Sequence, residues 1–311
     1  MENINIDNKP INNEEQEIIK ENTKFDEKDT EEQEIKKKLN DLLSKIECFD
    51  TSNWAKIHDK LNSGMIGTCL TSKDCYRIGF IKVLIDKAKE SNIHFAKDGN
   101  HFYVYNNQYW IKIREDLLKS FLHMASQKMG IPIGLSICVK FIKSTYEQLI
   151  ESGFFEKMVQ SNVTHLNVLN GTINIDLDGV KLVNFDSKHF LTHQLDFVYD
   201  KNRVNQVWLD FLNKVLPDKD TQKTLQQAIG YLFIKDLKLE KVIFLYGIGS
   251  NGKSVIFEII KGILSVDMMT NYSLASLTNH LGYQLADLNN KIINYGTDIS
   301  MKNVDLAIFK Q

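Results

Sequence analysis

The residues best suited to chemistry form one continuous run in the last quarter of the sequence. They are Gly247, Ile248, Gly249, Ser250, Asn251, Gly252, Lys253 and Ser254. The run fits the pattern G-x-x-x-x-G-K-[ST], in which backbone N–H groups surround the phosphates of a nucleotide. In that pattern Lys253 reaches the β- and γ-phosphates, and the Ser254 hydroxyl binds Mg²⁺. The spacing therefore predicts that these eight residues bind ATP with Mg²⁺.

The sequence on either side of this run predicts the elements that would position it. Residues 241–246 are apolar, β-branched and aromatic, which is typical of a buried strand, and residues 255–264 have the apolar spacing of a helix. The glycines allow backbone angles that other residues avoid, and the N-terminus of the helix favours an anion. The alternative is an ordinary glycine-rich turn without a ligand.

A nucleotide site of this kind also needs a carboxylate at the end of a neighbouring strand, where it holds Mg²⁺. Residues 291–298 form a short β-type run that ends in Asp298, 45 residues after Lys253. We expect Asp298 to be this acid, although Asn294 and Tyr295 make the run less apolar than usual. A simple surface aspartate is the alternative, and Asp287 is less well placed.

Three weaker groups could also carry chemistry, and each has a structural explanation. Asp176 and Asp178 could bind a metal ion as in a polymerase or primase, but they fit the tip of a hairpin better. His189 and His193 are four residues apart without an acidic partner, so we do not expect zinc there. The third group could stack DNA bases, but alternation on a hairpin favours packing in a core: Phe102, Tyr103, Tyr105, Tyr109 and Trp110.

The elements expected along the chain suggest four regions. Residues 1–45 hold 13 acidic residues against 8 lysines and almost no aromatic ones, which predicts a disordered acidic tail, turning helical near residue 35, that can be removed without loss of stability. Residues 46–200 predict one α+β domain, residues 201–240 a helical segment, and residues 241–311 a P-loop NTPase domain. The expected fold class is thus an α+β domain followed by an α/β P-loop domain with an incomplete parallel sheet.

Individual elements are expected as follows. Helical patterns cover residues 53–92, 115–129 and 135–152, and two more helices are expected between residues 205 and 235, the second capped by Asp218. Turn dipeptides at Asn106-Asn107, Asn170-Gly171 and Asp178-Gly179 predict hairpins over residues 101–113 and 166–185.

The composition narrows the class of protein. Apolar residues make up 43% and charged residues 25%, with a net charge of −2, as in an ordinary globular protein. No apolar run approaches the ~20 residues of a membrane helix, and the N-terminus lacks a secretory signal, so we expect a cytoplasmic protein without a membrane partner. The four cysteines match no zinc spacing: Cys48, Cys69, Cys75 and Cys138.

Several phrases together resemble the superfamily 3 primase-helicases of phages and plasmids, the branch with a poxvirus-type N-terminal domain. The phrases are WLDFL at 208–212, GYLF at 230–233, the loop GIGSNGKS, KIINYGTDIS at 291–300, HFLT at 189–192 and Tyr199-Asp200. The resemblance covers roughly residues 95–311. Asn251 discriminates best, because kinases and GTPases rarely have Asn-Gly-Lys-Ser after Gly-x-Gly-x.

This resemblance implies an ATP-dependent DNA helicase or primase-type replication protein of a phage or other mobile element, located in the host cytoplasm. It implies single-stranded or forked DNA as partner and a homo-oligomeric, hexameric ring. It gives Lys253 and Asp298 catalytic roles, and Ser254 and Asp298 the metal. Family members often have two adjacent acids where this sequence has Thr297-Asp298.

Only 71 residues remain from Lys241 onward, fewer than the ~100–150 of a common domain. We therefore expect a truncated P-loop domain with impaired hydrolysis. Two other functions stay open. One is a non-catalytic DNA-binding or assembly fragment with a residual loop, and the other is a P-loop small-molecule kinase, for which the chain has no room for a lid.

Overall fold

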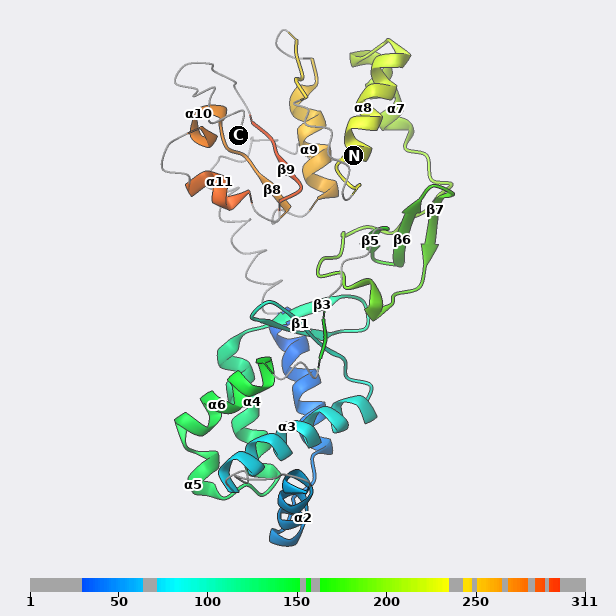
Figure 1. Cartoon of the computed structure of the whole chain (residues 1–311). Coiled ribbons are helices and arrows are strands. Elements are labelled where there is room, and N and C mark those ends of the chain that lie inside the picture. Colours follow the sequence, from blue (N-terminus) through cyan, green and yellow to red (C-terminus); the bar gives the residue numbers. More distant parts are fainter. Residues whose placement is uncertain are drawn as a thin grey trace, which may run out of the picture. The chain divides into compact units, whose positions relative to one another are not determined.

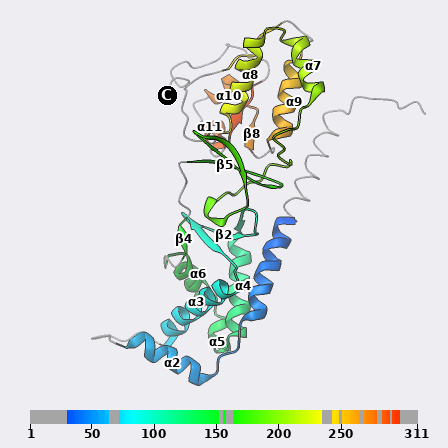
Figure 2. The ribbon, with the colours of Figure 1, turned by 90° about the vertical axis from the view of Figure 1, so that its right-hand side faces the viewer.

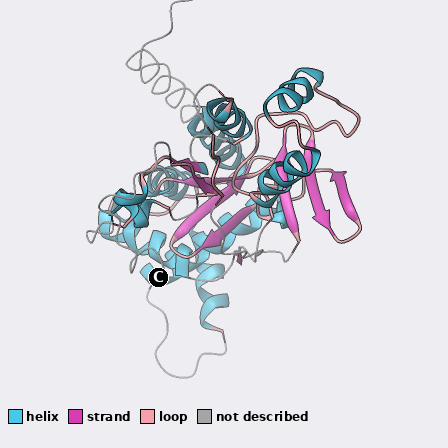
Figure 3. Ribbon diagram, turned by 90° about the horizontal axis from the view of Figure 1, so that it is seen from above, coloured by secondary structure: helices cyan, strands magenta, loops and turns pink. Residues whose placement is uncertain are grey.

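The computed structural model describes residues 30–63, 72–151, 155–157, 163–234, 243–247, 251–264, 268–278, 283–288 and 291–296. The chain divides into two units, Met1–Val159 and Gln160–Gln311. Both combine helices with small, mainly antiparallel sheets (Figure 1; strands magenta in Figure 3). No helix in the described ranges has the length and apolar character needed to cross a membrane.

The first unit consists of helices packed on one sheet. Its elements are helical residues 30–45, α2 (Thr51–Asn62), α3 (Ser72–Glu90), β1 (Phe95–Asp98), β2 (His101–Tyr105), β3 (Trp110–Ile113), α4 (Glu115–Lys128), α5 (Ile133–Ser136), α6 (Val139–Glu151) and β4 (Glu156–Lys157). The sheet order is β3-β2-β1-β4, with β4 parallel to β1 and the other pairs antiparallel.

The hairpin predicted around Asn106-Asn107 is confirmed. Strands β2 and β3 pair with Tyr105 opposite Trp110. Asn107 has a positive φ of 84°, and the Asn106 side chain accepts hydrogen bonds from the backbone N–H groups of the two residues that follow the Asn-Asn pair. Asparagine tolerates the left-handed region and bonds its own backbone, which explains why this dipeptide turns the chain.

Residues 30–45 are helical, as the sequence predicted from near residue 35 onward, but they pack in a core and are not part of a solvated acidic tail. Ile35, Leu39 and Leu42 are almost fully buried in the first core. The helix lies beside α4 in Figure 2, where the Lys128 ammonium donates to the backbone carbonyl of Leu43 at 2.8 Å. Helical spacing gathers the few apolar residues on one face while the charge runs project outward, so average composition concealed a core helix.

The second unit contains one three-stranded sheet, one very short strand pair and five helices of the described ranges, besides one 3₁₀ turn. Its elements are β5 (Thr164–Val168), β6 (Gly171–Asp176), β7 (Gly179–Val183), the 3₁₀ turn η1 (Ser187–His189), α7 (Gln206–Val215), α8 (Lys219–Tyr231), α9 (Lys253–Ile263), β8 (Met269–Thr270), α10 (Leu274–Leu277), α11 (Tyr283–Asp287) and β9 (Ile293–Asn294). The order β5-β6-β7 is antiparallel, whereas β8 and β9 pair in parallel.

The boundary between the units falls earlier than the predicted boundary at residue 200. Val168 and Ile173 of the β5–β7 sheet share a buried cluster with Ile256 and Ile260 of α9. The sheet that the sequence assigned to the preceding domain therefore belongs to the core of the unit that contains the Gly-Lys-Ser run. Two hairpin turns reveal strands, but they do not reveal which helix covers them.

The strand expected over residues 241–246 is not present in its described part. Residues 243–247 are irregular, and Tyr246 is 97% exposed. A strand requires a hydrogen-bonded neighbour, and none of the described segments pairs with these residues. The only sheet among the described residues in which every pairing is parallel is the pair β8 and β9, with two residues in each strand. This pair is much shorter than the parallel sheet predicted for a P-loop domain.

Candidate functional site: the loop at the start of helix α9

Helix α9 begins at the lysine of the Gly-Lys-Ser run. Gly252 occupies the N-cap position with φ 84°, a left-handed conformation that glycine adopts without strain. The first intrahelical bond runs from the N–H of Ile256 to the carbonyl of Gly252. The N–H groups of Lys253 and Ser254 therefore belong to the first turn, where a helix has no internal acceptors and attracts anions.

Gly252 has a second constraint from its surroundings. A Cβ at this position would lie 2.7 Å from Cζ of Phe211 and 3.2 Å from Cγ1 of Val215. Both residues belong to α7, so this helix contacts the loop directly. Any residue other than glycine would require either the Phe211 ring or the loop to shift.

The side chain of Lys253 folds back over the loop. Its ammonium donates to the carbonyl of Gly247 at 2.9 Å and to Oδ1 of Asn251 at 2.6 Å. These bonds join the first residue of the G-x-x-x-x-G-K-[ST] pattern to its lysine. Gly247 is also tightly covered, because a Cβ there would lie 1.7 Å from Nδ2 of Asn251.

The remaining residues of the predicted loop are described in part. Ser254 is an exposed residue on the first turn of α9. Ile248, Gly249 and Ser250 lie outside the described residues. A serine hydroxyl is a hard oxygen ligand of the kind Mg²⁺ accepts, so Ser254 fits its predicted role chemically.

The segment predicted to end in the metal-binding acid approaches α9. Tyr295, just after β9, packs its ring on Phe257 of α9 with centroids 4.4 Å apart, and its hydroxyl donates to the carbonyl of Lys253 at 3.5 Å. Burial raises the pKa of Tyr295. A tyrosine hydroxyl is already protonated at neutral pH, so it acts here as a donor. Asp298 lies outside the described residues.

The sequence did not predict that Asn294 and Tyr272 bond each other. Asn294 accepts hydrogen bonds from the Thr270 hydroxyl (3.0 Å) and the Tyr272 N–H (2.8 Å), and donates to the Tyr272 carbonyl (3.0 Å). The Tyr272 hydroxyl donates to Asp287 at 2.6 Å, which raises the pKa of Tyr272. The signal in the sequence was Asn294 itself, a polar residue inside an apolar run.

The weaker groups take structural roles. Asp176 ends β6 and accepts a hydrogen bond from the N–H of Asp178 at 2.8 Å, which confirms the hairpin tip. His189 stacks on His165, and no set of three potential metal ligands occurs among the residues the structure describes. In the aromatic group of the first hairpin, Phe102 lies in the first core and Tyr109 packs against it. The other three rings are buried, as expected of packing side chains: Tyr103, Tyr105 and Trp110.

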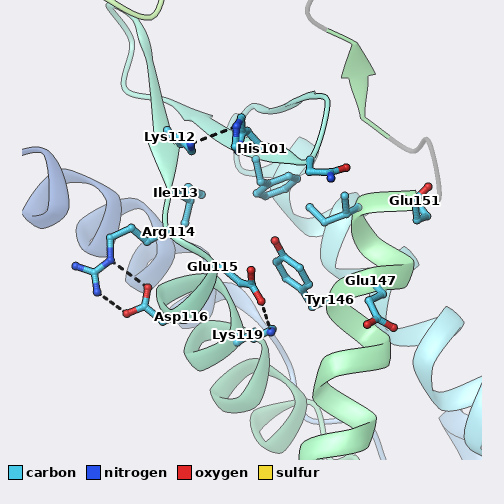
Figure 4. A pocket seen from close by; sticks show the side chains of 13 residues that line it. His101, Lys112, Ile113, Arg114, Glu115, Asp116, Lys119, Tyr146, Glu147 and Glu151 are labelled. Atoms are coloured by element: carbon cyan, nitrogen blue, oxygen red, sulfur yellow. Dashed lines mark hydrogen bonds and ion pairs between the residues drawn. The ribbon is translucent and has the colours of Figure 1, made fainter. Parts of the chain in front are cut away.

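A cavity of about 870 Å³ lies in the first unit between the β2–β3 hairpin, α4 and α6 (Figure 4). Its charged groups largely pair with one another. Arg114 forms an ion pair with Asp116. Lys119 forms an ion pair with Glu115, and its ammonium lies 4.9 Å from the centre of the Tyr146 ring. Because the two signs alternate around the wall, the cavity offers no uniformly positive surface to phosphates.

No protein-family model matches this chain, and no curated protein matches its sequence significantly. The interpretation of the α9 loop therefore depends on its own residues and geometry.

Proposed function

We propose that the second unit binds ATP with Mg²⁺ through residues 247–254 and hydrolyses it. We further propose that the chain is an ATP-dependent helicase of the primase-helicase type, which acts in the DNA replication of a phage or other mobile element. One observation carries the proposal: the left-handed Gly252 starts α9 so that the Lys253 ammonium folds over the loop onto Gly247 and Asn251.

The bonds of Lys253 suit an exchange for phosphate. Two of its acceptors, the Gly247 carbonyl and the Asn251 amide oxygen, are neutral. A hydrogen bond from an ammonium to a phosphate oxygen is charge-assisted and roughly twice as strong as one between neutral groups. A triphosphate can therefore displace these acceptors, while the N–H groups of the first turn of α9 bind its other oxygens.

The proposed metal site consists of Ser254, which the structure describes, and Asp298, which is proposed from the sequence alone. Ser254 would hold Mg²⁺, whose charge neutralises the phosphates during transfer to water. Asp298 follows Tyr295 by three residues, which span at most about 11 Å. Since the Tyr295 hydroxyl bonds the carbonyl of Lys253, the chain approaches the loop shortly before Asp298.

The DNA-related part of the proposal comes from the resemblance alone. Single-stranded or forked DNA as partner and a hexameric ring are what the primase-helicase motifs imply. Hydrolysis at the loop would be the source of energy for unwinding, with Lys253 as the residue that contacts the transferred phosphate.

ATP hydrolysis by the full chain, with and without single-stranded DNA, tests the proposal. Lys253→Ala should abolish ATP binding and turnover but leave the melting temperature close to that of wild type, because its ammonium bonds only loop groups among the contacts described. Lys261→Ala is the matched control, since Lys261 lies on the same helix and, within the described part of the chain, pairs only with Glu258 at 3.3 Å.

The outcomes separate the candidate functions. Turnover stimulated by DNA and lost in Lys253→Ala supports a helicase. Transfer of phosphate to a small-molecule acceptor points to a kinase instead. Binding of DNA without ATP binding or turnover identifies a non-catalytic fragment and contradicts the proposal.

A further inference from the structure

We infer that Trp208 provides the surface on which the base of the bound nucleotide stacks, so that the site accepts nucleoside triphosphates with little selection among bases. This inference rests on the proposed nucleotide site. It adds a residue from α7, outside the G-x-x-x-x-G-K-[ST] pattern, and it defines the class of substrate.

Helix α7 contacts the loop where the phosphates would lie. Phe211 approaches within 2.7 Å of the Cβ position of Gly252, and Val215, one turn further, approaches within 3.2 Å. Such an approach leaves no space for a layer of other side chains between α7 and the start of α9. A ligand bound to the first turn of α9 therefore has α7 as a direct neighbour.

Trp208 extends this contact along α7. Its ring stacks on that of Phe211, with centroids 5.5 Å apart and planes inclined by 20°. Trp208 is half-buried, so part of the indole stays open to solvent. The two rings form a continuous aromatic surface that begins at Gly252, and Trp208 also packs against the buried cluster of the second unit.

The aromatic surface is held in place before any ligand binds. The N-cap residue Asn205 accepts a hydrogen bond from the N–H of Trp208 at 3.1 Å. At the other end of α7, the Gln222 side chain of α8 donates to the Leu216 carbonyl at 2.7 Å and to Asn213 at 3.1 Å. A surface that is already ordered loses little entropy on binding.

The neighbours of Trp208 explain the expected tolerance for different bases. The residues one turn further along α7 on the same side of the helix, Phe211 and Leu212, are both apolar. Stacking on an aromatic ring serves every base, because each has a π-face, whereas discrimination needs polar groups that bond the base edge. ATP, GTP, CTP and UTP should therefore bind within about tenfold of one another, purines more tightly than pyrimidines.

Binding of Mg-ATP and of Mg-tripolyphosphate to the full chain tests this role. Tripolyphosphate carries the phosphates without a base, so it reports the loop alone. Trp208→Leu keeps an apolar side chain but removes the aromatic face, and should weaken ATP binding about 5- to 100-fold while leaving tripolyphosphate binding unchanged. Trp208→Phe should restore most of the ATP affinity, and Val207→Ala serves as the control on the same helix.

Three results would overturn the inference. Unchanged ATP affinity in Trp208→Leu, with wild-type binding of both ligands, removes the stacking role but keeps the nucleotide site. An equal loss of ATP and tripolyphosphate binding shows that Trp208 only supports the loop by packing. If the wild-type chain binds neither ligand, the nucleotide site itself is wrong, and with it the base surface.

Discussion

Phe211 of α7 and Gly252 at the start of α9 lie so close that a side chain at residue 252 would require the Phe211 ring to shift. The Cβ position of Gly252 is 2.7 Å from Cζ and 3.0 Å from Cε2 of Phe211, and the backbone there is left-handed at φ 84°. Glycine is thus favoured at position 252 for two reasons: the left-handed backbone there, and the ring of Phe211, which lies 41 residues earlier in the sequence. Changes in α7 should consequently be felt in the loop.

Gly252→Ala should destabilise the second unit by about 2–4 kcal/mol, from backbone strain and the collision with Phe211. Urea denaturation measures the loss. Gly262→Ala is the matched control, because Gly262 lies on the same helix with no atom within 4 Å of its Cβ position. It should be neutral or up to about 1 kcal/mol more stable. Equal stabilities for the two variants would contradict the placement of α7 against the loop.

Leu42→Ala should cost about 2–5 kcal/mol of unfolding free energy, since Leu42 is fully buried in the first core and truncation leaves a cavity. Lys37→Ala on the exposed face of the same helix should change stability by less than about 0.5 kcal/mol. Thermal or chemical denaturation of both variants separates a core helix from the dispensable tail that composition suggested. An unchanged stability of Leu42→Ala would instead support the dispensable tail.

Asn294→Ala should lower stability by about 1–3 kcal/mol, because the N–H and carbonyl of Tyr272 and the Thr270 hydroxyl lose their partner in a half-buried place. Asn294→Asp keeps the acceptor but loses the donor, so its loss should be smaller. Denaturation curves of the two variants give the order. If Asn294→Asp is the less stable one, the hydrogen bonds are assigned to the wrong atoms of the amide.

Acid should destabilise the second unit through His189. Burial lowers the pKa of His189, the adjacent His165 lowers it further, and Asp186 acts in the opposite direction. The His189 imidazole is therefore protonated more readily in the unfolded chain than in the folded one. Its contribution to the free energy of unfolding is complete above the ordinary histidine pKa and is lost as the pH falls below it. The melting temperature should therefore drop between pH 7 and pH 5.

His189→Phe keeps a ring to stack on His165, at 4.3 Å between centroids, but cannot be protonated. This variant should show a weaker dependence of the melting temperature on pH over the same range. His94→Gln, an exposed change in the first unit, should leave the dependence as in wild type. If His189→Phe shows the same fall in melting temperature with acid as wild type, other titrating groups cause the fall.

Much of the secondary structure could be predicted because its signals are local. Asn205 and Asp218 cap α7 and α8 through bonds to N–H groups three residues ahead. Asn107 and Gly179 adopt positive φ where the hairpins turn. These signals act over a few residues, so reading the sequence is enough to find them.

The candidate site was predictable only in its composition. The sequence identified Lys253 and the loop glycines from spacing, and the start of α9 at Lys253 agrees with that spacing. The bond of Lys253 to Asn251, and the support of Asn294 for Tyr272, depend on which atoms meet after folding. The polar residue in an apolar run was visible, but its partners were not.

The sequence by itself determined the hairpin turns, the helix caps and the residues of the Gly-Lys-Ser run, because each depends on the backbone preferences and hydrogen bonds of residues close along the chain. Only the tertiary structure decided that Ile35, Leu39 and Leu42 enter the first core, that the β5–β7 sheet shares a core with α9, and that Phe211 covers Gly252. Burial is a property of two surfaces that meet. A hydrophobic pattern shows that a face needs a partner, but the partner is selected by packing across the whole unit.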